Sequence, residues 1–89
     1  QLKPDNAAVV DTLGWMLVEQ GKTERGLELL ERAVSLAPDA QEIRYHLAQA
    51  WLKAGDRIKA RDELERILSG GAKFPQEQEA IQLLKELRN

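Results

Sequence analysis

The sequence contains no cysteine, a single histidine and only four aromatic residues among its 89 residues. Without cysteine the chain cannot form disulfides, use a thiolate as a nucleophile or bind zinc through sulfur. One histidine, His46, cannot alone provide the convergent ligands of a metal site, so we expect none. The aromatic residues are too few for a compact enzyme core; they are Trp15, Tyr45, Trp51 and Phe74.

Two further absences limit the partners. No apolar run approaches the roughly 20 residues of a membrane-spanning helix, so we expect no direct membrane contact in this segment. The formal net charge is −2, whereas nucleic acids require a basic surface, so we expect no nucleic-acid partner. The glycine-rich loops that bind nucleotide phosphates are also missing, and we expect no cofactor.

The sequence repeats itself with a period of about 34 residues, which is typical of an array of short helical units. Comparing residues 1–35 with the residues one period later gives nine identities. These are Leu2/Leu36, Pro4/Pro38, Asp5/Asp39, Leu13/Leu47, Gly21/Gly55, Leu30/Leu64, Glu31/Glu65, Arg32/Arg66 and Ser35/Ser69.

Each unit is predicted to contain two helices. The first begins at an Asp5 or Asn6 N-cap and ends at Gly21, and the second runs from a Thr23 N-cap to Leu36. The third begins at a capping box formed by Asp39 and Glu42 and ends at Gly55, and the fourth follows an Asp56 N-cap. Pro75 is expected to start a fifth helix that runs to about Leu87 and caps the array.

Apolar spacing predicts the buried side of each helix. The expected buried residues are Val10, Leu13, Gly14 and Leu17; Gly26, Leu30, Ala33 and Val34; Ile43, Leu47, Ala50 and Ala54; Ile58, Ala60, Leu64, Ile67 and Leu68; and Ala80, Ile81, Leu84 and Leu87.

The pattern of Leu13-Gly14, Gly21, Gly26 and Pro38 resembles the tetratricopeptide repeat (TPR), and Leu47-Ala48, Gly55 and Ala60 continue it in the second unit. The resemblance implies an all-α, right-handed solenoid in which small residues lie where paired helices cross. It implies four parts: 1–6, the tail of a preceding repeat; 7–40 and 41–74, two repeats; and 75–89, a capping helix. The phrases DTLGWMLVEQG and IRYHLAQAWLKAGD also resemble C-terminal repeats of bacterial TPR lipoproteins associated with the PEP-CTERM/exosortase system, which implies a cell-envelope location.

In TPR arrays the first helix of each pair lines a concave groove, so the resemblance implies a groove for a peptide or partner helix. By spacing, its residues are Asp11, Trp15, Val18, Glu19, Glu42, Tyr45, Gln49, Leu52 and Lys53. Two hypotheses remain open for Trp15, which either contacts a ligand or packs between adjacent first helices. Tyr45 is expected in the groove, because its amphipathic ring suits a wet boundary, and Trp51 in the core.

Three functions are compared. The first is a non-catalytic interaction module that binds a protein or peptide. The second is a structural end of a longer superhelix that self-associates through Val9, Leu13 and Met16, which would be bare without a preceding repeat. The third, an enzyme, lacks support, because His46 has no nucleophile at a suitable spacing.

The charged pairs Glu28/Arg32, Lys59/Glu63, Arg61/Glu65 and Asp62/Arg66 predict a solvated outer face.

Overall fold

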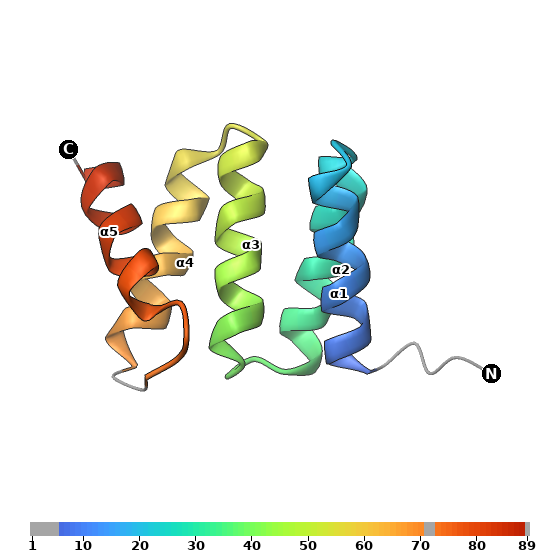
Figure 1. Ribbon diagram of the computed structural model, residues 1–89, viewed down its shortest axis with the longest axis horizontal. Coiled ribbons are helices and arrows are strands. Elements are labelled where there is room, and N and C mark those ends of the chain that lie inside the picture. The colour runs from blue at the N-terminus through green and yellow to red at the C-terminus, as the bar shows by residue number, and fades with distance from the viewer. Residues whose placement is uncertain (1–5, 71–72, 89) are drawn as a thin grey trace.

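The computed structural model describes residues 6–70 and 73–88, which form five α-helices and no strand. The helices are α1 (Ala7–Glu19), α2 (Thr23–Leu36), α3 (Gln41–Lys53), α4 (Arg57–Ser69) and α5 (Glu77–Arg88). Successive helices run antiparallel and form a row along the longest dimension of a molecule of 45 × 27 × 17 Å, with α1 in front of α2 at one end (Figure 1). The predicted all-α class of stacked helix pairs is confirmed. Residues 1–5 of the tail expected at 1–6, which include the alternative N-cap Asp5, lie outside the described residues.

Capping by side chains and glycine fixes several helix ends where the sequence predicts them. Asn6 Oδ1 accepts a hydrogen bond from the Val9 amide at 3.2 Å, and Asp56 Oδ1 accepts one from the Lys59 amide at 3.0 Å. After α1 and α3 the chain turns through Gly21 and Gly55, whose φ angles are 86° and 88°. Only glycine adopts this left-handed conformation without strain, so these two residues end the first helix of each pair.

Three other predicted helix starts are wrong by one or two residues. The N-cap of α3 is Ala40, which has no side-chain acceptor, so Asp39 and Glu42 form no capping box. In α2 the N-cap is Lys22, and Thr23 is the first helical residue. Pro75 lies in a turn before α5, where the Glu77 amide donates to the Phe74 carbonyl.

The paired helices α1 and α2 cross at two glycines, as predicted. A Cβ atom at Gly26 would lie 2.7 Å from the Gly14 carbonyl oxygen and would overlap Val18 Cγ2. A Cβ atom at Gly14 would lie 3.1 Å from the Gly26 carbonyl oxygen. Ala48 and Ala60 at the matching positions of α3 and α4 are fully buried. Small residues at these positions therefore allow the close approach within each helix pair.

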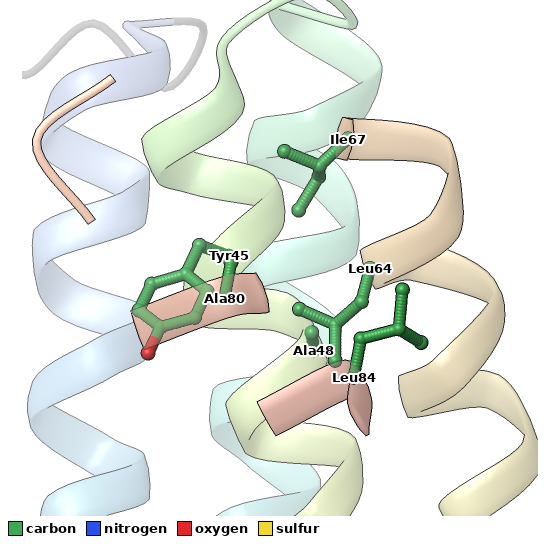
Figure 2. Packing of buried hydrophobic residues seen from close by; sticks show 6 residues of the cluster. All are labelled: Tyr45, Ala48, Leu64, Ile67, Ala80 and Leu84. Carbon is green, nitrogen blue, oxygen red and sulfur yellow. The ribbon is translucent and has the colours of Figure 1, made fainter. Parts of the chain in front are cut away.

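The core consists of three apolar clusters arranged along the row rather than around one centre, which is how a solenoid buries its apolar surface. The first contains Val10, Ala33 and Ile43; the second contains Val18, Leu27, Leu30, Leu47 and Ala50; and the third contains Tyr45, Ala48, Leu64, Ile67, Ala80 and Leu84. Figure 2 shows the third cluster. α3 contributes at least one residue to every cluster.

Three residues predicted to be inward are exposed instead. Leu13 lies on the side of α1 that faces away from α2, because α1 uses Val10, Gly14 and Val18 as its buried side. Ala54 is the exposed C-cap of α3. Ile58 is 65% exposed, because it lies in the first turn of α4 on the side away from buried Ala60 and Leu64.

Candidate partner-binding groove

Most of the predicted groove residues remain accessible along the neighbouring helices α1 and α3. Glu19, Glu42 and Lys53 are exposed, whereas Asp11, Trp15, Gln49 and Leu52 are half-buried. Of the nine predicted groove residues these seven can contribute surface to a partner, and two others cannot.

Val18 is the first correction. Its side chain is 2% exposed and packs with Leu27, Leu30 and Leu47 between α1, α2 and α3. The missing side chain of Gly26 leaves the space that Val18 Cγ2 fills. Val18 is therefore a core residue.

Tyr45 is the second correction, because its side chain is only 7% exposed. Its ring lies 6.4 Å from that of Phe74, measured between centroids, and it packs beside Ala80 of α5 (Figure 2). Burial raises the pKa of Tyr45 above 10.0, and the nearby Glu79 carboxylate raises it further. The segment that leads into α5 and the short side chain of Ala80 therefore cover a residue expected to face a ligand.

His46 takes part in a cross-helix contact that the sequence-based argument missed. Its Nδ1 atom lies 2.8 Å from Asp11 Oδ1, and the Trp15 ring stacks on its imidazole with centroids 4.9 Å apart and an interplanar angle of 19°. Asp11 and Trp15 can both reach His46 because they are one turn apart on α1. Of the two hypotheses for Trp15, packing between adjacent first helices describes this arrangement. The sequence does contain an indication of this contact. Asp11 and Trp15 are one turn apart in the first helix of one unit, and His46 is a polar residue in the first helix of the next unit.

A hollow of about 310 Å³ lies between α1, α3 and the segment that leads into α5. Its apolar lining includes Ala8, Ile43 and Phe74, and Asp11 and Glu42 supply carboxylates at its edge. The full lining is Ala8, Asp11, Ala40, Gln41, Glu42, Ile43, Lys73, Phe74 and Pro75. Apolar surface bordered by polar groups is the arrangement of a typical peptide-binding surface.

Most of these charged residues of the second helices are exposed, as expected for a solvated outer face, and two of the carboxylates make longer-range contacts. Glu63 binds Arg44 of α3, with 3.1 Å between Oε1 and Nη1, rather than Lys59. Glu65 accepts a hydrogen bond from Arg88 of α5 at 2.9 Å rather than from Arg61. Within the described chain, Glu28/Arg32 and Asp62/Arg66 form no ion pair either.

Lys59 instead lies over the Trp51 ring, 4.5 Å from its centroid. Trp51 is half-buried and packs against the second cluster, close to its predicted core position.

The predicted self-association residues form an exposed apolar face on α1. Val9, Leu13 and Met16 are 42%, 46% and 48% exposed. Their equivalents in the second unit, Ile43, Leu47 and Ala50, are at most 8% exposed because α2 covers them. The apolar face of the first helix is therefore covered by a helix in the second unit and exposed in the first unit.

Within residues 6–70 and 73–88 no cluster of three or more His, Asp or Glu side chains has the geometry of a metal site. None of the described helices combines the length and apolarity needed to cross a membrane.

Comparison with known proteins agrees with the helical repeats. The family model for the tetratricopeptide repeat matches residues 17–76, which is more than half of the chain. A search of curated proteins finds no significant match.

Proposed function

Because the chain belongs to the tetratricopeptide repeat family, whose repeats typically act as non-catalytic protein-interaction modules, we propose that its first helices bind a peptide or a partner helix. The observation that carries this proposal is the hollow between α1, α3 and residues 73–75. Its apolar lining would accept a side chain of the partner, and exposed polar residues along α3 would contact the partner backbone.

The proposed groove differs from the one predicted from sequence. It comprises Asp11, Glu42, Gln49 and Leu52 together with the apolar lining at Ala8 and Phe74. Two contacts hold residues of its lining in place: Trp15 stacks on His46, the partner of Asp11, and Tyr45 packs against Phe74.

Glu42→Lys tests the groove, because Glu42 is exposed and borders the hollow. The matched control is Glu28→Lys, which makes the same charge change at an exposed position of α2. With the whole chain as bait, we expect a partner captured by the native protein and by the control to be lost from Glu42→Lys. A partner retained equally by both variants would place binding elsewhere. Circular dichroism would verify that both variants fold.

The open face at Val9, Leu13 and Met16 supports a second candidate function, self-association. A helix covers the equivalent residues of the second unit, so the same cover on α1 would bury three large apolar side chains. A second copy of the chain would supply that cover and join two arrays end to end.

A cell-envelope location remains a proposal that rests on two phrases, DTLGWMLVEQG and IRYHLAQAWLKAGD, and on their resemblance to envelope lipoproteins. Cell fractionation of the tagged protein in its native host would test it. Recovery in the cytosolic fraction alone would refute it.

A further inference from the structure

The turn between α3 and α4 borders a hollow of about 650 Å³ on a different part of the molecule from the proposed groove. Two apolar side chains line it, Ile58 from the first turn of α4 and Leu87 from the end of α5. Ile58 is 65% exposed, more than any other large apolar residue in the described chain. Its full lining is Ala54, Gly55, Asp56, Arg57, Ile58, Arg61 and Leu87.

Two arginines border the same hollow with their guanidinium groups uncommitted. Arg61 would reach Glu65 one turn along α4, but Glu65 accepts a hydrogen bond from Arg88 instead. Within the described residues, neither Arg57 nor Arg61 makes an ion pair or a side-chain hydrogen bond. The lining has one carboxylate, Asp56, and that group caps its own helix through the Lys59 amide. The hollow therefore carries positive charge in a chain whose formal net charge is −2.

The matching turn of the first unit lacks the apolar part of this hollow. The hollow at the α1–α2 turn is lined by Gly21, Lys22, Thr23, Glu24 and Arg25. Glu24 occupies the position of Ile58, so an acid stands where the second unit has its exposed isoleucine. Two cations and one acid line each hollow, but only the second has large apolar side chains beside them.

We propose that the hollow at the α3–α4 turn binds a protein segment in which a large apolar side chain is flanked by carboxylates. The apolar side chain lies against Ile58 and Leu87, which removes exposed apolar surface from water. The carboxylates bind Arg57 and Arg61, whose planar guanidinium groups form paired hydrogen bonds with such groups. An acidic segment fits because the two guanidinium groups outnumber the single carboxylate of the lining, Asp56.

The probe is a synthetic amphipathic peptide of about 12 residues with leucines on one face and glutamates elsewhere, enough for roughly three helical turns. A second peptide with lysine in place of every glutamate is its control. Binding to the whole chain is measured by fluorescence anisotropy and located by backbone amide NMR shifts. We expect the acidic peptide to bind at least about tenfold more tightly than the basic one and to shift the amides of Gly55, Ile58 and Leu87.

Two variants separate the charged part of the site from its apolar part. Arg57→Gln with Arg61→Gln should weaken acidic-peptide binding about tenfold, and Ile58→Ala should weaken it by roughly threefold to fivefold. The control is Lys22→Gln with Arg25→Gln, which removes two positive charges at the matching turn of the first unit and should change binding less than about twofold.

Several results would overturn the proposal. They are equal losses in the arginine variant and its control, tighter binding of the basic peptide, no binding of either peptide, or amide shifts confined to α1. Competition by single-stranded DNA as effective as by the peptide would also overturn it, because the arginines would then be a general anion site.

Discussion

The Nδ1 atom of His46 on α3 lies 2.8 Å from Oδ1 of Asp11 on α1, which joins the first helices of two successive repeats. Both side chains are shielded from water, with 24% and 13% of their side-chain surface exposed. This contact does not depend on apolar packing between the repeats, so it can be removed without opening a core cavity.

Replacing Asp11 with Ala removes the partner of His46 and should therefore lower the free energy of unfolding by about 1 kcal/mol, the usual net worth of one hydrogen bond. Urea denaturation followed by circular dichroism measures the change. Glu19→Ala provides the control, because Glu19 is exposed on the same helix without an ion-pair partner in the described chain. Equal stability of the two variants would show that the contact contributes nothing.

Gly26→Ala should destabilise the protein by roughly 2 kcal/mol, because the added methyl group would overlap Val18 and the Gly14 carbonyl. Gly21→Ala should cost about 1 kcal/mol, since its Cβ atom would enter open space and only the left-handed φ of 86° is strained. Thermal unfolding of both variants measures the difference. A larger loss for Gly21→Ala would contradict the close crossing of α1 and α2.

Tyr45 is the only tyrosine, so its absorbance near 295 nm reports a single phenol. Its pKa in the folded protein should lie above 10.0, raised first by burial and second by Glu79. The folded state then holds the phenolic proton to higher pH than the unfolded state does. The stability due to this proton is complete below about pH 10 and is lost as pH rises through the folded-state pKa.

Two comparisons check the origin of that shift. The unfolded chain in guanidinium should titrate near 10, the ordinary value for tyrosine. Glu79→Gln should bring the folded-state pKa part of the way down, because it removes the smaller of the two causes. A phenol that titrates at the same pH in the folded and unfolded chain would mean that Tyr45 is in contact with water.

Replacing Leu13 and Met16 together with Gln should abolish any concentration-dependent dimer, because both side chains belong to the open apolar face of α1. Sedimentation velocity over a wide range of concentration measures the dimer. Ile58→Gln is the control, because it makes the same apolar-to-polar change at an exposed residue of α4. A native protein that stays monomeric at the highest concentration would refute self-association through this face.

The helices, the left-handed glycines and the close crossings could be predicted because each depends on local residue chemistry that recurs in both units. The position of α5 could not. α1 begins at Ala7 and α3 begins at Gln41, so a third first helix in the same register would begin at Pro75, whereas α5 begins at Glu77. α5 and the preceding Phe74 cover Tyr45, and the periodicity of the sequence does not say which residues of α3 the following helix covers.

The errors at Val18 and Ile58 have a different origin. Periodicity identifies the apolar residues of a helix but does not say which neighbour covers each one. Val18 is buried because Gly26 opposite has no side chain, and Ile58 is exposed because it lies in the first turn of α4 on the side away from the core. The same limit applies to His46, whose importance depends on two α1 residues in the preceding unit.

α3 contributes residues to all three apolar clusters: Ile43 to one, Leu47 and Ala50 to another, and Tyr45 and Ala48 to the third. A fluctuation that frays α1 or α5 disrupts clusters at one end only, whereas opening α3 requires every cluster to separate. The amide protons of α3 should therefore exchange with solvent deuterium through global unfolding, and those of α1 and α5 through smaller openings. The middle helix is therefore expected to open only when the whole array unfolds.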